Sequence, residues 1–193
     1  MLAIAFKEWA VICRALAEGR QSLILRKGGI AEDQGRFRPE YEQFLLYPTH
    51  FHEQHRIGIK PELLPLLEQV ERDRPEAGRI RFTHFASVSQ VWHVDDLDKA
   101  LALNDLHGWT AEEVAKRYRY RLPGLYVLAV RIYQLPESAE VVERPEYAGC
   151  KTWVQLDAPI STDGAMPVAA WAPVEPDPKA GILGSRKEMR HSC

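Results

Sequence analysis

The sequence predicts an α+β fold: a mixed, mostly antiparallel sheet that can close into a barrel, with about four flanking helices. Residues 79–94 alternate apolar and polar side chains as a half-buried strand does, and a change of frame near Val91 predicts a bend or bulge. Residues 125–134 are apolar almost throughout, which is typical of a strand buried on both faces. The helical patterns between these strands are spaced too irregularly for a Rossmann-type sheet.

The first 50 residues of the chain are expected to hold a helix and two short strands. Near the N-terminus apolar residues recur at spacings of three and four, and Gly19 offers a helix end. Two short apolar runs follow, bounded by polar, glycine or proline residues as strands commonly are. The expected elements are a helix over residues 2–17, a strand over 21–26, a loop over 31–40 and a strand over 44–47.

The elements from residue 61 onward are predicted from capping residues and apolar runs. Asp95 or Asp96 can cap one helix, and Thr110 with Glu113 forms the capping box of another. The expected elements are helices over residues 61–72, 95–106 and 110–120, and short strands over 140–143 and 151–156.

Residues 1–157 are expected to form a single globular domain, followed by an extended or disordered tail over 158–193. A chain of 193 residues is long enough for one domain with a hydrophobic core. After Asp157, prolines punctuate small and polar residues, a composition poor in core-forming side chains. Trp171 either tethers this tail or serves as an interaction motif.

The composition is typical of a soluble, cytoplasmic protein. Hydrophobic residues make up 46% and charged residues 27%, and the net charge is −2, so an anion site must arise from local clustering. No apolar stretch approaches the ~20 residues of a membrane helix. The N-terminus lacks the basic region of a signal peptide. Three cysteines, odd in number and far apart, fit a reducing compartment.

Three histidines, His50, His52 and His55, fall within six positions directly after the apolar run that ends at Pro48. Imidazole ligates metals and hydrogen-bonds phosphate. The segment therefore fits a divalent-metal site that Glu53 can join, a phosphate or polar-ligand site, or ordinary polar residues of a loop. The standard spacings of zinc proteases and of paired-cysteine sites are missing.

Two basic segments are candidates for binding phosphate. In Arg26-Lys27-Gly28-Gly29, two cations stand beside glycine amides that an anion can approach closely, although a hairpin turn with basic decoration fits equally well. The run from Lys116 to Arg121 interleaves cations with tyrosines, as a surface for single-stranded nucleic acid does. The same run ends a predicted helix, where cations also favourably meet the negative end of the dipole.

Five blocks of the sequence resemble the bacterial family called domain of unknown function 1802. They are Lys-Glu-Trp-Ala at 7–10, Leu-Arg-Lys-Gly-Gly-Ile at 25–30, Phe-Leu-Leu-Tyr-Pro-Thr at 44–49, Leu-Tyr-Val-Leu-Ala-Val-Arg-Ile-Tyr at 125–133 and Gly-Cys-Lys-Thr-Trp-Val at 149–154. The resemblance covers about residues 5–157, and the family has no established activity. Its members are sometimes found with a Mrr-type restriction endonuclease domain, which this chain lacks. The resemblance thus implies an association with restriction–modification proteins.

A weaker likeness concerns the fold. Trp9 on a helix, then Gly19 and a strand ending in Arg26, is similar in layout to ASCH-type members of the PUA-like superfamily. Those are small β-barrels that bind RNA or modified nucleotides. Of their pattern Gly-x-Lys-x-x-Glu-x-Arg this chain keeps the glycine and arginine, whereas Gln21 and Ile24 replace the lysine and glutamate. The likeness implies a PUA-like barrel and leaves the ligand site undefined.

We expect a cytoplasmic, non-catalytic module that binds nucleic acid or a nucleotide without a cofactor. The expected ligand residues combine cations for phosphate, glycines for close approach, and side chains that stack or hydrogen-bond: Arg26, Lys27, Gly28, Gly29, Tyr47, Thr49, His50, His52, Arg117, Arg119 and Arg121. One alternative is a metal-dependent hydrolase or nuclease that holds a divalent ion with His50, His52 and His55. Another is a protein-interaction subunit recruited through the tail.

Overall fold

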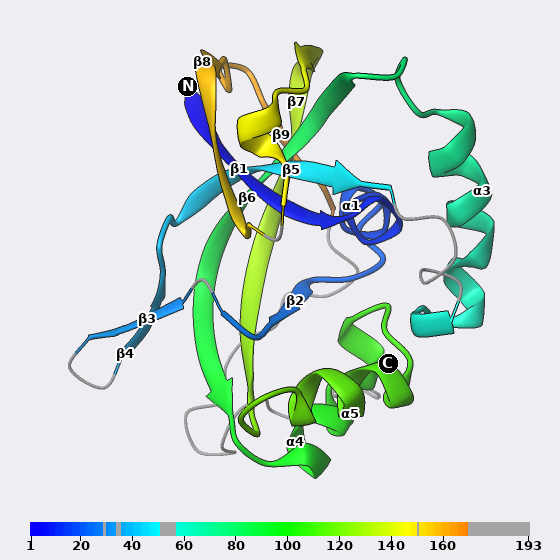
Figure 1. The fold of residues 1–193 in the computed structure, drawn as a ribbon, viewed down its shortest axis with the longest axis vertical. Coiled ribbons are helices and arrows are strands. Elements are labelled where there is room, and N and C mark those ends of the chain that lie inside the picture. Colours follow the sequence, from blue (N-terminus) through cyan, green and yellow to red (C-terminus); the bar gives the residue numbers. More distant parts are fainter. Residues whose placement is uncertain (29, 34–35, 51–56, 150, 170–193) are drawn as a thin grey trace, which may run out of the picture.

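A strongly curved, mixed sheet forms the body of the molecule (Figure 1). The computed structural model describes residues 1–28, 30–33, 36–50, 57–149 and 151–169, with 30–33 and 36–38 described by their backbone alone. Six strands follow the order β2-β7-β6-β5-β1-β8, and β9 pairs with β7. The strands are β1 Leu2–Trp9, β2 Leu23–Arg26, β5 Gln43–Thr49, β6 Arg79–Val94, β7 Leu125–Val142, β8 Trp153–Ile160 and β9 Met166–Pro167. Only β1 and β5 run parallel.

Four α-helices occur within the described residues, so the expected α+β class with a mostly antiparallel sheet is confirmed. They are α1 Ala10–Ala17, α3 Leu64–Arg72, α4 Leu97–Ala102 and α5 Ala111–Arg119, with 3-10 turns at Pro61–Leu63, Asn104–Leu106 and Pro145–Tyr147. α1 packs on β5 and α3, whereas α4 and α5 pack on each other near the end of β6 (Figure 1). The sheet is open, because its edge strands β2 and β8 do not pair.

The expected helix over residues 2–17 is wrong in its first half. Residues Leu2–Trp9 form β1, and the helix α1 begins only at Ala10. β1 lies between β5 and β8, so its backbone groups pair with a strand on either side. This pairing outweighs the helical spacing of the apolar side chains, as tertiary context commonly does.

The expected loop over residues 31–40 is also wrong. β3 (Ile30–Asp33) and β4 (Arg36–Pro39) form an antiparallel hairpin that projects from the main sheet (Figure 1). Pairing between the two strands satisfies backbone groups of a segment whose polar composition carries no strand signal.

The two longest strands confirm the strongest local signals in the sequence. β6 spans Arg79–Val94 without interruption, and its register against β7 shifts between Val88 and Gln90, close to the predicted change of frame, and also between Phe82 and His84. β7 spans Leu125–Val142 and therefore includes all but the last residue of the separate strand expected over 140–143. The strands expected over 21–26, 44–47 and 151–156 correspond to β2, β5 and β8.

Both predicted helix caps form. The Asp96 carboxylate accepts hydrogen bonds from the backbone N–H groups of Asp98 (2.8 Å) and Lys99 (3.2 Å) at the start of α4. The Thr110 hydroxyl accepts one from the backbone N–H of Glu113 (3.2 Å) at the start of α5. Each side chain satisfies donors that the first helical turn leaves without intrahelical partners.

The chain keeps its ordered pairing beyond residue 157. β8 continues to Ile160, and β9 adds residues 166–167 to β7. The backbone N–H of Val168 donates to the carbonyl of Ile132 at 2.9 Å. Trp171 lies outside the described residues. No helix in the described part of the chain has the length and apolar character needed to cross a membrane.

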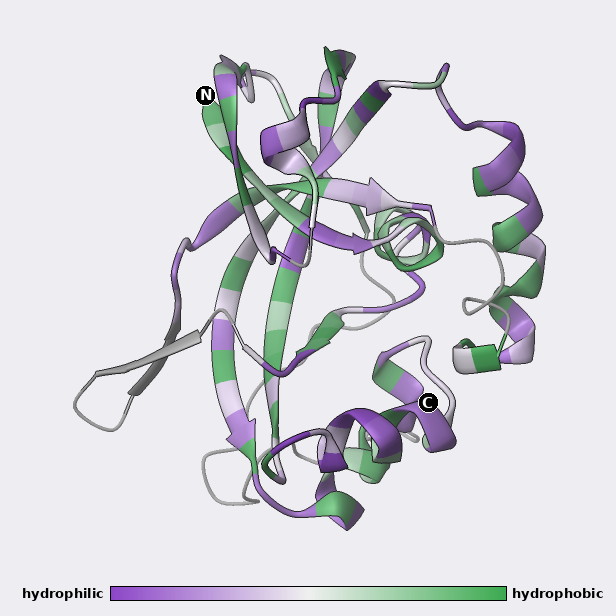
Figure 2. Ribbon diagram, in the orientation of Figure 1, coloured by the Kyte–Doolittle hydropathy of each residue, from purple (hydrophilic) through white to green (hydrophobic). Residues whose placement is uncertain are grey.

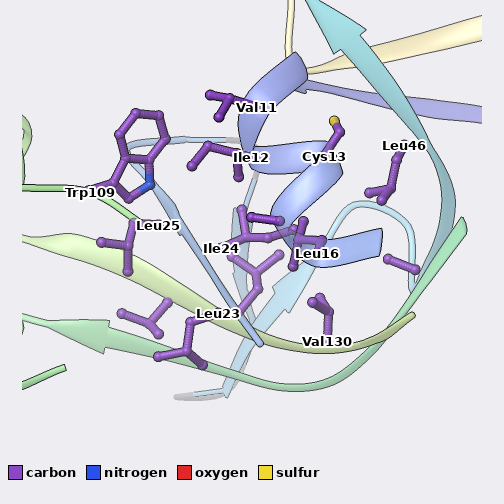
Figure 3. Close-up of a cluster of buried hydrophobic side chains, with 14 of the residues drawn as sticks. Val11, Ile12, Cys13, Leu16, Leu23, Ile24, Leu25, Leu46, Trp109 and Val130 are labelled. Atoms are coloured by element: carbon purple, nitrogen blue, oxygen red, sulfur yellow. The ribbon is translucent and has the colours of Figure 1, made fainter. Parts of the chain in front are cut away.

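Two hydrophobic clusters lie on opposite faces of β5. Phe44 and Leu46 belong to the larger cluster and Leu45 and Tyr47 to the smaller one, because successive side chains of a strand point to opposite faces. Hydrophobic residues recur along the central strands and α1 (Figure 2). In the larger cluster, side chains of α1, β2, β5 and β7 pack together with Trp109 (Figure 3).

His107 is a buried histidine beside Trp109, only 4% exposed. Its Nδ1 accepts a hydrogen bond from the backbone N–H of Trp109 at 3.2 Å, and its Nε2 has no partner within the described residues. Burial above all, and then the charges of Lys60 and Arg117, lower the pKa of His107 to about 3. The imidazole is therefore neutral in the folded chain at physiological pH.

We expect acid to destabilise the fold through His107. Between pH 6.5 and about 3 the unfolded chain binds a proton at this position that the folded chain does not, so the free energy of unfolding falls as the pH falls. His107 should account for a loss of about 2–3 kcal/mol between pH 7 and pH 4.5, measured by urea unfolding. The variant His107→Asn keeps an acceptor for Trp109 and cannot become charged. Equal losses in the variant and the parent chain would contradict the prediction.

Candidate functional site

The predicted ligand residues do not lie together in one place. Arg26 and Thr49 contact Glu8, which is buried, and the charge of Arg117 acts on Arg26. Lys27 and Gly28 lie beside the C-terminal end of α5, where Arg119 and Arg121 also lie. Tyr47 and His50 face other parts of the molecule, and Gly29 and His52 lie outside the described residues.

Arg26 and Glu8 form an ion pair inside the protein. Nη1 of Arg26, at the end of β2, lies 3.6 Å from Oε2 of Glu8 on β1, and Glu8 is only 2% exposed. Nη2 of Arg26 donates to the hydroxyl of Thr152 at 2.9 Å, and the guanidinium lies 4.7 Å from the ring centre of Phe6. Thr152 directly precedes β8. Arg26 therefore connects the two edges of the sheet, which no backbone ladder joins.

Glu8 also organises the backbone around it. Its Oε1 accepts a hydrogen bond from the backbone N–H of Trp9 at 2.8 Å, and its carbonyl accepts one from the hydroxyl of Thr49 at 2.9 Å. Its Oε2 has no hydrogen-bond donor in the described structure beyond the ionic contact with Arg26. Burial lowers the pKa of Arg26, and the neighbouring Glu8 opposes that effect.

Arg117 connects α5 to the same region. Its guanidinium lies 3.6 Å from the ring centre of Trp109 and 5.4 Å from that of Trp9. Its Nε donates to the carboxylate of Glu113, one helical turn earlier, at 2.8 Å. Stacking on indole rings and pairing with a carboxylate both hold an arginine in place. Arg117 thus packs inward and is not part of the exposed basic surface of α5.

Lys27 fixes the loop that follows α5. Its ammonium donates to the carbonyls of Tyr118 (3.2 Å) and Gly124 (2.7 Å), and to that of Leu122. These carbonyls include orphan acceptors at the helix C-terminus, where a cation is favourable. Gly28 is exposed, and a Cβ atom built there would meet nothing within 4 Å. The Lys27–Gly28 turn and the α5 loop therefore form one continuous piece of surface.

The end of α5 exposes cations around an aromatic ring. Tyr120 is 56% and Leu122 79% exposed, and the guanidinium of Arg121 lies 5.1 Å from the ring centre of Tyr120. We call the exposed residues of this region the α5 loop surface: Lys116, Arg119, Tyr120, Arg121 and Leu122. Within the described parts of the chain, neither Arg119 nor Arg121 forms an ion pair with a carboxylate.

Arg121 has an unusual backbone conformation. Its φ is +61°, and among the described residues it is the one non-glycine residue with positive φ. The left-handed region costs an L-residue with a Cβ roughly 1 kcal/mol or more, and such strain tends to persist where it serves function.

Tyr47 and His50 have partners of their own. Tyr47 is 3% exposed, its hydroxyl donates to the carboxylate of Glu143 at 3.2 Å, and burial, followed by the charge of Glu143, raises its pKa. Nδ1 of His50 lies 3.3 Å from the carboxylate of Glu71 on α3. His55, like His52, falls outside the described residues. Within the described residues no three histidine, cysteine or acidic side chains converge as metal ligands do.

The Glu8–Arg26 pair was absent from the sequence-based site. Glu8 falls inside the helix expected over residues 2–17, where it has no reason to be buried. Its one local signal is its position in the Lys-Glu-Trp-Ala block, and nothing in the sequence relates that block to a residue 18 positions later. Tyr120 belongs to the run from Lys116 to Arg121 that was considered as a nucleic-acid surface, but it was not included among the expected ligand residues. Leu122 follows that run and was not considered.

Comparison with known proteins identifies one family. The model described as "Domain of unknown function (DUF1802)" matches residues 5–172, which confirms the resemblance seen in the sequence. No curated protein matches the chain. Among solved structures, a point mutant of ASCH from Zymomonas mobilis is similar with a TM-score of 0.48 and 8% identity, covering 79% of this chain and 87% of that chain. Another ASCH structure from the same organism has a TM-score of 0.47 and 10% identity over 79% and 86%.

We expect loss of Arg26 to destabilise the protein strongly. The variant Arg26→Met leaves the Glu8 carboxylate buried without a counter-charge, which should lower the free energy of unfolding by about 3–5 kcal/mol. Urea unfolding at pH 7 measures the change. The double variant Glu8→Gln, Arg26→Met removes both charges and should recover a large part of that loss. If the double variant is less stable than Arg26→Met, the buried pair does not have the role assigned to it.

Proposed function

The chain belongs to the family described as domain of unknown function (DUF1802), and we propose that it is a non-catalytic module that binds nucleic acid or nucleotides through the α5 loop surface. The observation that carries the proposal is the strained Arg121, whose guanidinium stacks on the exposed Tyr120. Glycine would adopt this φ without cost, so backbone stability alone does not favour an arginine here. A backbone-strained arginine on an exposed ring is instead understandable as a binding element held ready for a ligand.

The chemistry of the α5 loop surface suits a single-stranded nucleic acid. Exposed cations neutralise phosphate groups, and an exposed aromatic ring offers a face on which a base can stack whatever its identity. Lys116, with a side chain that is 79% exposed, and Arg119 extend the positive charge along the helix end. The exposed Leu122 adds apolar area beside the ring.

Lys27 would act in this function by positioning and not by contact with phosphate. Its ammonium is already held by three carbonyl groups around the loop. Those bonds hold the backbone of residues 118–124 in one conformation before any ligand arrives. A surface that is ordered in advance binds more tightly, because less conformational entropy is lost on association.

We expect binding to depend on salt in proportion to the few cations involved. With three cations at the phosphates, affinity for a labelled single-stranded oligonucleotide should fall roughly 20-fold between 50 and 200 mM salt. Fluorescence anisotropy measures this dependence. The double variant Arg119→Gln, Arg121→Gln should weaken binding and reduce the salt slope by about 0.7–1 for each arginine removed.

A matched variant and a choice of strands complete that experiment. Arg131 is an exposed arginine midway along β7, and Arg131→Gln removes the same charge away from the α5 loop surface. An equal loss of affinity in Arg131→Gln, or no binding at low salt, would refute the proposal. If the module serves restriction–modification, as the family resemblance implies, DNA should compete better than RNA of equal length and sequence.

The strain at Arg121 can be tested separately from its charge. Arg121→Gly and Arg121→Gln both remove the guanidinium, but only glycine adopts φ of +61° without cost. Arg121→Gly should therefore be more stable than Arg121→Gln by about 1 kcal/mol in thermal or urea unfolding, while both bind oligonucleotide more weakly. A glycine variant that is less stable than the glutamine variant would show that the loop does not hold this residue under strain.

A further inference from the structure

A cleft of about 210 Å³ lies away from the α5 loop surface, between α1, the end of α3 and the first part of β6. Three arginines reach it from three different elements: Arg14 from α1, Arg74 from the segment after α3, and Arg81 from β6. Asp73 is the acidic residue among those that line it. The carboxylates of Glu71 and Glu140, which contact Arg74 and Arg81, are not part of the lining. The wall of the cleft is therefore rich in guanidinium groups.

Asp73 holds two of these guanidinium groups near one another. Its carboxylate pairs with Nη2 of Arg14, and its backbone carbonyl accepts a hydrogen bond from Nη1 of Arg81 at 3.1 Å. A guanidinium carries five N–H donors. Nε of Arg14 lies 3.9 Å from the carboxylate of Glu18, and the hydrogen bonds of Arg14 within the described structure use Nη2 alone. The N–H groups of Nη1 therefore remain for a second anion.

Two imidazoles and an apolar floor complete the cleft. Nδ1 of His84 lies 2.8 Å from the hydroxyl of Thr83, and burial, helped by the charge of Arg14, lowers the pKa of His84 to about 4. His84 is therefore uncharged at neutral pH and available as a hydrogen-bonding group. His50 lines the same cleft, and Ala10, Cys13 and Leu46 supply apolar surface.

We propose that this cleft binds a small organic anion, with its carboxylate or phosphate group at Arg14 and Arg81 beside His84 and its apolar part against Ala10, Cys13 and Leu46. Guanidinium groups recognise planar carboxylates and phosphates through paired hydrogen bonds. Apolar lining with a few convergent polar groups is the usual make-up of a small-molecule site. The cleft is lined by α1 and the first part of β6, whereas α4 and α5 lie near the other end of β6 (Figure 1). A small ligand in the cleft would therefore not touch the α5 loop surface.

Titration of the full chain with phenyl phosphate and with benzoate tests the proposal, with phenol as the uncharged probe. Histidine signals in NMR spectra report binding at His84. At least one of the two anions should bind saturably, shift the His84 signals and raise the pKa of His84, since a nearby negative charge favours imidazolium. Phenol should bind at least tenfold more weakly. Which anion binds more tightly identifies a carboxylate or a phosphate ligand.

Matched variants locate the binding. Arg14→Gln should weaken anion binding at least tenfold, whereas Arg131→Gln, which removes an exposed arginine on β7 outside the cleft, should leave it unchanged. If Arg14→Gln does not fold, Ala17→Glu places a carboxylate at the cleft wall and should abolish binding. Oligonucleotide affinity should stay the same in these variants. Absence of saturable binding by either anion, equal binding of phenol, or equal losses in Arg14→Gln and Arg131→Gln would overturn the proposal.

Discussion

The contact between Arg26 and Glu8 determines how the sheet is held in its curved shape. Backbone hydrogen bonds end at β2 on one edge and at β8 on the other, and the guanidinium of Arg26 reaches from the first edge to Glu8 on β1 and to Thr152 before the second. The side chain of Arg26 thus joins the two edges of the sheet, which backbone hydrogen bonds would join in a closed barrel. Since both charges are buried, the pair tolerates the loss of neither partner alone.

The basic residues of the two predicted phosphate-binding segments divide into buried structural residues and exposed ones. Arg26 turns inward to the ion pair, and Lys27 turns to the carbonyl groups behind α5. Arg117 packs on indole rings, while Arg119 and Arg121 face solvent. Cations that look equivalent in the sequence therefore have different tasks: some hold the fold together and others remain available to an anionic ligand. The net charge of −2 gives no indication of which cations are buried and which are exposed.

The sequence predicted the elements that carry a clear local pattern of their own. The alternation of β6, the apolar run of β7 and the caps Asp96 and Thr110 appear as the sequence indicated. β1 was missed because its strand conformation depends on partners 40 and about 150 residues away. The predicted site was divided for a related reason. Tyr47 donates to Glu143 and Thr49 donates to the carbonyl of Glu8, and nothing in the sequence relates these residues to those partners.

The order in which the strands pair has a consequence for how the chain is made. β1 is synthesised before both of its neighbours in the sheet, which are β5 and, near the end of the described chain, β8. β2 likewise waits for β7, about 100 residues later. Contacts so distant in sequence make folding slow, because the entropy of closing long loops is lost before the stabilising contacts form. Until β8 emerges from the ribosome, one side of β1 presents unpaired N–H and C=O groups, and such an edge can pair with another nascent chain.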